Sequence, residues 1–215
     1  MKDLINKEFL KRVLSVVIFI PIVIFPIIYS NYFSLLIYLI FNTIIVYELS
    51  NMKNKNVNTT FINCTIIIST FSFFFFLLIL ITKPDIKNII IQIILTIWAF
   101  DTFSYLGGKI IGGKKLMPSI SAGKTYSGLV VGITLTLVVA QIYQIVNFGY
   151  ELINLIFTIL IIFLSFFGDI YASILKRVSS VKDSSNYLPG HGGFYDRFDS
   201  FIGVFFIFGL FGIFL

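Results

Sequence analysis

Long apolar segments, separated by short polar ones, dominate the sequence. A helix needs about 20 mostly apolar residues to cross the hydrocarbon core of a membrane, with a range of roughly 17 to 25. The second and the last of the segments found on this scale are short enough to tilt or to cross only in part. The pattern predicts an all-α, polytopic transmembrane helical bundle of about seven spans. These spans are expected near residues 13–30, 32–47, 61–82, 86–107, 128–147, 152–168 and 201–215.

The composition points to the same class, because 58% of the residues are apolar, only 12% are charged, and the mean hydropathy is +0.99. Soluble domains carry about 25% charged residues, so a water-soluble enzyme and a disordered binder are both excluded. The single cysteine, Cys64, lies inside an apolar segment. It excludes a disulfide framework and a cysteine-based metal cluster.

The lysine and arginine residues collect on one side of the predicted bundle. When the segments alternate across the membrane, 14 of the 16 cations fall at the N-terminus and in segments 48–60, 108–127 and 169–200. The positive-inside rule therefore predicts a multi-pass protein of the plasma (inner) membrane, with its N-terminus and long polar segments in the cytoplasm. This topology explains the net charge of +6, and we expect no nucleic-acid partner.

Two aspartates lie in apolar surroundings: Asp101 is inside the fourth predicted span, and Asp169 directly follows the sixth. An ionisable group at membrane depth costs roughly 2.5–3.5 kcal/mol on insertion scales and usually faces a cavity or a partner. Both are functional candidates; the alternative is a carboxylate at the interface, solvated or paired with a lysine. If the helix of Asp169 continues, Ser173, Lys176 and Arg177 share one face with it. A carboxylate, a hydroxyl and two cations suit Mg²⁺ and phosphate oxygens.

The stretch VKDSSNYLPGHGGFYDRFDS, residues 181–200, combines glycines and the only histidine, His191, with Asp183, Asp196 and Asp199. Glycines let a backbone approach a ligand closely, and N–H groups exposed in such loops bind anions. The alternative is a solvated loop whose glycines only turn the chain. So many acids and cations in a chain with only 12% charged residues favour a site for metal and phosphate.

Residues 107–128, GGKIIGGKKLMPSISAGKTYSG, supply lysines and hydroxyls without acids. They do not form a P-loop, because the spacing between glycine and the G-K-T triplet differs and no predicted strand precedes them. A basic loop that only sets the topology explains the lysines equally well. Because the segment shares a predicted membrane face with the acidic stretch, we expect it to act on a polyanionic substrate.

At these segments the chain resembles a known family. SILKRVSSVKDSSNYLPGHGGFYDRFDS, residues 173–200, closely resembles the C-terminal signature of the phosphatidate cytidylyltransferases (CDP-diacylglycerol synthases), which reads S-x-x-K-R, K-D, P-G-H-G-G and D-R-x-D. DTFSYLGGKIIGG is similar to the family's D-T-x-A-Y segment, SISAGKTYSG to its S-P-K-K-T-x-E-G segment, and Tyr47-Glu48-Leu49 to part of its start. The family commonly shows Pro, Lys and Glu at the positions of Ala122, Gly123 and Ser127.

The resemblance implies a Mg²⁺-dependent nucleotidyltransferase of phospholipid biosynthesis, which converts CTP and phosphatidate to CDP-diacylglycerol and diphosphate. It implies a homodimer in the lipid bilayer, with N-terminal membrane helices over 1–85 and a catalytic region over 86–215 that carries cytoplasmic loops 108–127 and 169–200. The implied catalytic residues are Asp169, Asp196, Lys176 and Arg177.

The same resemblance implies a metal site and a substrate site. Asp169, Asp196 and Ser173 would hold Mg²⁺, and a second, monovalent cation such as K⁺ would accompany it. His191 is expected to hydrogen-bond phosphate or to position Asp196 rather than act as a general base, because a phosphate monoester is already an anion at neutral pH. The implied substrate-binding residues are Asp101, Ser121, Lys124, Ser173, Asp183, His191, Gly192, Gly193 and Arg197.

Two other functions are open at this point. A related membrane nucleotidyltransferase or kinase acting on another lipid phosphate or on a polyprenol shares these features, since nothing in the sequence encodes the choice of lipid. A polytopic transporter also places aspartates in the membrane, but it distributes polar residues near the midplane. Here the polar residues collect at one face, which favours an enzyme.

The predicted topology can be tested by cysteine labelling. In a Cys64→Ser background, a cysteine at Gly190 should react with a membrane-impermeant maleimide in inverted membrane vesicles but not in intact cells. Labelling from outside intact cells would overturn the orientation.

Overall fold

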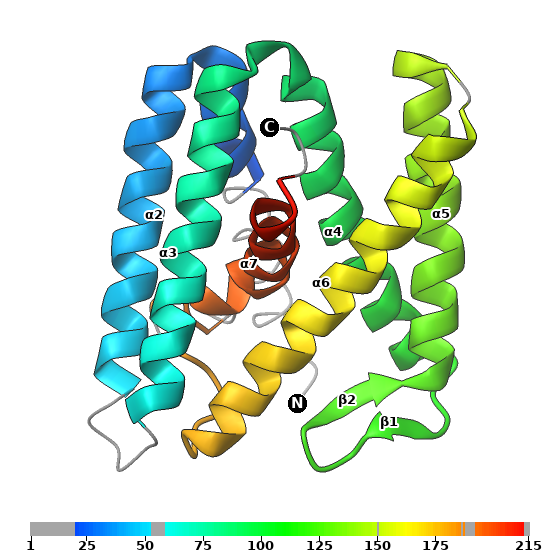
Figure 1. Ribbon diagram of the computed structural model, residues 1–215. Coiled ribbons are helices and arrows are strands. Elements are labelled where there is room, and N and C mark those ends of the chain that lie inside the picture. The colour runs from blue at the N-terminus through cyan, green and yellow to red at the C-terminus, as the bar shows by residue number, and fades with distance from the viewer. Residues whose placement is uncertain (1–19, 53–58, 150, 186, 188–191, 213–215) are drawn as a thin grey trace, which may run out of the picture. The chain divides into compact units, whose positions relative to one another are not determined.

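The computed structural model describes residues 20–52, 59–149, 151–185, 187 and 192–212 (Figure 1). A short apolar helix, Ile20–Tyr29, comes first. The helices that follow are α2 (Asn31–Met52), α3 (Thr59–Thr82), the 3₁₀ turn η1 (Pro84–Ile86), α4 (Lys87–Ile110), α5 (Tyr126–Phe148), α6 (Leu152–Val178) and α7 (Tyr195–Leu210). Two short strands, β1 (Lys115–Met117) and β2 (Ser121–Thr125), separate α4 from α5.

Within the part of the chain that the structure describes, five helices, α2 to α6, are long and apolar enough to cross a membrane. This confirms the predicted all-α, polytopic class, whereas the count of seven spans stays a prediction. The first predicted span lies largely outside the described residues. The last differs from its expected bounds, because α7 begins at Tyr195, before the apolar run, and has 16 residues. At 1.5 Å per residue it is about 24 Å long, less than the roughly 30 Å of a hydrocarbon core.

The segment between α4 and α5 differs from the loop expected there, because it contains an antiparallel hairpin. Lys115 pairs with Thr125 and Met117 with Ser121, with an irregularity between the two pairs. Strands of three and five residues are too short for a two-residue alternation to stand out in the sequence.

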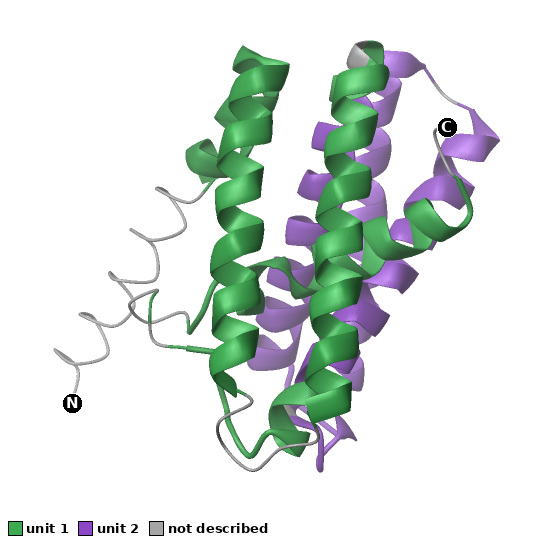
Figure 2. Cartoon of the chain, turned by 60° about the vertical axis from the view of Figure 1, so that its left-hand side comes forward, with its two compact units in different colours: residues 1–87, 175–215 green, residues 88–174 purple. Residues whose placement is uncertain are grey.

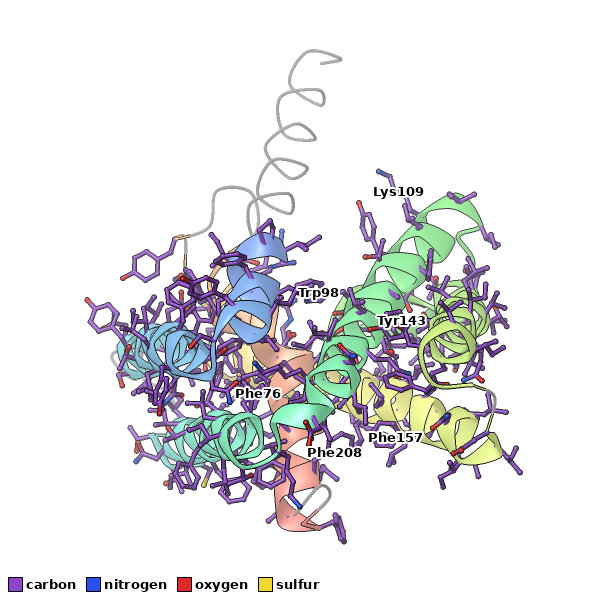
Figure 3. All side chains as sticks on the ribbon, turned by 90° about the horizontal axis from the view of Figure 1, so that it is seen from above. Phe76, Trp98, Lys109, Tyr143, Phe157 and Phe208 are labelled. Atoms are coloured by element: carbon purple, nitrogen blue, oxygen red, sulfur yellow. The ribbon has the colours of Figure 1, made fainter. Side chains whose placement is uncertain are left out.

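The chain forms two compact units (Figure 2), one of residues 1–87 and 175–215 and one of residues 88–174. In the first unit α3 packs against both α2 and α7. Aromatic rings fill this core: the Tyr38 and Phe76 centroids lie 4.5 Å apart, as do those of Phe201 and Phe205. Phe76 and Phe208 are fully buried (Figure 3). Buried hydroxyls bond to backbone carbonyls, as Tyr38 does to Val23 at 2.7 Å.

In the second unit, small residues bring α4 and α5 together. A Cβ added at Gly128 would lie 2.5 Å from the carbonyl oxygen of Ser104, and one at Gly107 would lie 2.6 Å from Cβ of Val131. Gly128 and Gly132 form a G-x-x-x-G pattern on α5, which lets helix backbones approach closely in membranes. Thr125 caps α5 by accepting a hydrogen bond from the Gly128 amide at 3.0 Å. The close approach therefore holds the end of β2 against α4.

Polar side chains tie the far end of α5 to α6. The Gln144 amide nitrogen donates to the carbonyl of Asn154 at 3.2 Å and the Gln141 amide nitrogen to the Gln144 oxygen at 2.6 Å. Gln144 is buried, so these bonds satisfy groups that would be costly to leave unpaired in lipid.

Replacing Gly128 by alanine should destabilise the protein, because the added methyl group meets a backbone carbonyl that cannot turn away. Overpacking of this kind lowers the free energy of unfolding by about 1–3 kcal/mol. For a chain of this size, each kcal/mol lowers the melting temperature by roughly 2–4 °C. The measurement is the melting temperature in detergent. Gly123→Ala is the control, because a Cβ there meets nothing within 4 Å. An unchanged melting temperature for Gly128→Ala would disprove the close approach.

Candidate functional site

Helix α6 carries four predicted site residues along its last turns. It continues to Val178, ten residues past the predicted end of the span, so Asp169, Ser173, Lys176 and Arg177 all lie on one helix. The spacing assumed from the sequence therefore holds. Ser173 is buried and Arg177 is exposed.

Asp169 forms an ion pair with Lys124, whose Nζ lies 2.7 Å from Oδ2 of the carboxylate. Lys124 comes from β2, and its Nζ also lies 5.2 Å from the centre of the Phe166 ring, one turn before Asp169. The Nζ atom is shielded from solvent, while the carboxylate side chain stays 32% exposed. The hairpin thus brings a lysine of the basic segment to the aspartate of α6, as the shared membrane face suggested.

Ser121 and Asp101 belong to the same unit. Ser121 opens β2, three residues before Lys124, and is half-buried. Asp101 lies on α4 with an exposed side chain. Their assignment to the substrate site stays a prediction.

In the other unit, Asp196 in the first turn of α7 accepts four short contacts. Lys176 Nζ lies 2.7 Å from Oδ1, and Oδ2 accepts from the Ser184 amide at 2.8 Å, the Ser184 hydroxyl at 3.0 Å and the Gly193 amide at 3.0 Å. The Asp196 side chain is only 6% exposed. Burial raises the pKa of Asp196, but the Lys176 ammonium and the two amides outweigh it and hold the pKa below its ordinary value. Asp196 is therefore a carboxylate at neutral pH.

The two glycines before α7 let the backbone approach this carboxylate. Gly192 has a φ of +81°, and a Cβ there would lie 2.7 Å from Oδ2 of Asp196 and 3.2 Å from Cβ of Asp183. A Cβ at Gly193 would meet the hydroxyls of Ser184 and Ser185. Larger residues at either position would push the segment away from Asp196.

The remaining predicted residues of this unit lie at its surface. Asp183 and Arg197 are exposed, in the segment before Ser184 and in the first turn of α7. His191 lies outside the described residues, so its expected role stays a prediction.

Glu48, near the end of α2, lies in the Tyr47-Glu48-Leu49 match to the start of the family, but the sequence assigned it no role in the site. It is 1% exposed, and its carboxylate accepts from the hydroxyls of Ser184 and Ser185 and from the amides of Phe194 and Tyr195. Besides that match, the sequence held a second signal, because no lysine or arginine lies three or four residues from Glu48. An acid at the end of a span without a local partner needs one from elsewhere in the chain.

The donor set fits a hard cation. Carboxylate and hydroxyl oxygens are the ligands of Mg²⁺, which takes one or two carboxylates and fills its other positions with water and phosphate. Asp169 and Ser173, one helical turn apart, supply both kinds of oxygen. Among the described residues no group of three or more acids, histidines and cysteines comes together, as it would in a cage made of protein alone.

The sequence matches the model of the cytidylyltransferase family over residues 9–215. It is 31% identical to the phosphatidate cytidylyltransferase of Rickettsia conorii, over 94% of this chain and 90% of that enzyme. It is 49% identical to the Bacillus subtilis enzyme of the same name and 41% identical to that of Staphylococcus saprophyticus. These two matches cover 50% and 57% of this chain but only 41% and 48% of the relatives. With nearly its whole length matched, the chain belongs to the cytidylyltransferase family.

Proposed function

We propose that this chain is a phosphatidate cytidylyltransferase, which makes CDP-diacylglycerol and diphosphate from CTP and phosphatidate for phospholipid synthesis. The observation that carries the proposal is the match to the Rickettsia conorii phosphatidate cytidylyltransferase, which spans 94% of this chain. The arrangement of acids and cations at Asp169 and Asp196 supports it, because this reaction joins two polyanions.

In this reaction a phosphate oxygen of phosphatidate attacks the α-phosphorus of CTP. The new P–O bond forms as the bond to the β-phosphate breaks, and diphosphate leaves with the negative charge. Phosphatidate is an anion at neutral pH, so no side chain has to remove a proton from the nucleophile. The protein must instead neutralise charge and hold the attacking and leaving oxygens in line.

Four cations are available for this task. Lys124 and Lys176 are each held by an aspartate at 2.7 Å, which fixes the position of the ammonium before a substrate arrives. An ammonium has three donors, so in this proposal either lysine contacts phosphate oxygens while it stays beside its aspartate. Arg177 and Arg197 are exposed and can bind phosphate through two parallel hydrogen bonds.

Asp169, Ser173 and Asp196 are the residues that would hold Mg²⁺. The ion, when bound, neutralises the charge that develops on the transferred and leaving phosphates. The Asp169 side chain stays 32% exposed, although its Oδ2 lies against Lys124. Asp196 uses Oδ2 on three donors and Oδ1 on Lys176, so it can bind a metal only if the lysine moves toward phosphate.

The proposal extends to the setting of the reaction. Asp101, Ser121 and Lys124 would line the pocket for the nucleotide or the lipid phosphate, and Asp183, His191, Gly192 and Gly193 would shape the phosphate-binding loop. We place the site at the cytoplasmic face of the plasma membrane, where CTP is available, in a homodimer that also uses a monovalent cation such as K⁺.

The direct test is turnover. Membranes that contain the protein should convert radiolabelled CTP and phosphatidate to a CDP-lipid in the presence of Mg²⁺, and EDTA should stop the reaction. A panel of other lipid phosphates and polyprenols tests the competing substrate classes. Absence of turnover with phosphatidate under every metal condition would refute the proposal. Preference for another lipid would show that the enzyme acts on that lipid instead.

Asp169→Asn should lower kcat by about 100-fold or more, because an amide neither holds a divalent cation nor fixes the Lys124 ammonium as a carboxylate does. Membrane content and melting temperature should stay near those of the wild type. Asp85→Asn, which changes an exposed acid in η1, is the matched control. Normal rates for Asp169→Asn would remove this residue from the site.

A further inference from the structure

Glu48 is a buried carboxylate whose described partners all come from one distant segment, residues 184–195. Its Oε1 accepts from the Ser185 hydroxyl at 2.6 Å and the Phe194 amide at 2.9 Å, and its Oε2 accepts from the Tyr195 amide at 2.9 Å and the Ser184 hydroxyl at 3.2 Å. With a relative exposure of 1%, it has little contact with water. The four donors therefore replace its hydration.

These bonds supply what the start of α7 lacks. The first amides of a helix have no partner within the helix, and a side chain at the N-cap position usually accepts from them. Phe194 occupies that position and has no side-chain acceptor. Glu48 accepts from the Phe194 and Tyr195 amides in its place, and its negative charge suits the positive end of the helix. Thus α2 supplies the cap of α7 from 147 residues away.

The same segment links Glu48 to Asp196. The Ser184 hydroxyl lies 3.2 Å from Oε2 of Glu48 and 3.0 Å from Oδ2 of Asp196, and its single proton can be donated to only one of them at a time. The amide of Gly193 points to Asp196, and the next two amides point to Glu48. The segment is held between two carboxylates.

The space around Gly193 shows how closely this arrangement is packed. A Cβ there would lie 2.7 Å from Oε2 of Glu48 and 2.7 Å from the Ser185 hydroxyl. There is thus no room for a side chain at Gly193. Because the Phe194 and Tyr195 amides donate to Glu48, a shift of this carboxylate would pull on the backbone next to Gly193, whose amide donates to Asp196. Through Asp196 the shift reaches Lys176, whose ammonium lies 2.7 Å from Oδ1.

We propose that Glu48 is a positioning residue of the transfer reaction: it holds Ser184, Ser185 and the 193–195 backbone in the arrangement that sets Asp196 and Lys176 for the CTP phosphates and Mg²⁺. This inference rests on the proposed function. Glu48 acts on Asp196 through the Ser184 hydroxyl and the 193–195 backbone. A role in folding alone would leave the kinetic constants of the folded protein unchanged.

The test compares Glu48→Gln and Glu48→Asp with Glu151→Gln, which changes an exposed acid before α6. A glutamine side chain presents an NH₂ group to two of the four donors and so loses those bonds. Per folded protein, Glu48→Gln should lower kcat by about 10- to 100-fold, in line with the loss of one or two charge-assisted hydrogen bonds. It should also raise the Mg²⁺ concentration needed for half-maximal rate. Glu48→Asp, which keeps the charge, should recover part of both effects, and Glu151→Gln should match the wild type.

Hydrogen exchange gives a second readout that needs no activity. Peptides covering residues 192–198 should exchange faster in Glu48→Gln than in the wild type, because the Phe194 and Tyr195 amides lose their acceptor. If Glu48→Gln fails to fold, Ser185→Ala removes one donor from the opposite side and should shift the same readouts by a smaller amount.

Two results would overturn the inference. One is unchanged kcat and Mg²⁺ dependence in folded Glu48→Gln, and the other is an activity loss that only follows the fraction of folded protein. Absence of wild-type turnover would refute the proposed function instead, and the exchange data would then decide separately whether Glu48 holds the segment.

Discussion

A carboxylate at the edge of an apolar medium must find donors within the protein, and this constraint organises both candidate regions. Water is scarce at such sites, and an unpaired charge there is costly. Asp169 is paired with Lys124, Asp196 with Lys176, and Glu48 with two hydroxyls and two amides. Each of these partners lies on a different element from its acid, so satisfying the acids also fixes the hairpin and the segment before α7.

The helical class of the fold followed from the sequence because the signal is summed over 20 or more residues. Four of the spans, 32–47, 61–82, 128–147 and 152–168, lie within helices that differ from them mainly at their ends, and 86–107 begins one residue before α4. The ends were less predictable because apolar runs do not show where backbone hydrogen bonding stops: α6 extends through charged residues to Val178 and α7 begins among them. The hairpin of β1 and β2 was missed because its strands are too short to show the alternation of apolar and polar residues that is typical of a strand.

The placement of the candidate residues was predictable where it depends on spacing along one helix, as with Asp169, Ser173 and Lys176. It was not predictable where it depends on contacts between distant segments. Glu48 and Tyr195 are 147 residues apart, and no local pattern links them. The sequence showed only that Glu48 lies at the end of an apolar segment, with no lysine or arginine three or four residues away. Such an acid should be treated as one member of a pair whose other member is still to be found.

The lysine–aspartate pairs also bear on how the site can meet a substrate with several negative charges. Several cations close together would repel one another, and a carboxylate beside each ammonium offsets this repulsion. When a phosphate approaches, each lysine can keep its carboxylate and share its remaining donors, or pass to the phosphate and leave the carboxylate to a metal ion. If Lys176 passes to the phosphate and Asp196 binds the metal ion, Lys176 must leave Oδ1 while the Ser184 and Gly193 donors stay on Oδ2. A segment fixed from the α2 side by Glu48 meets that requirement, because its amides remain in place when the lysine moves.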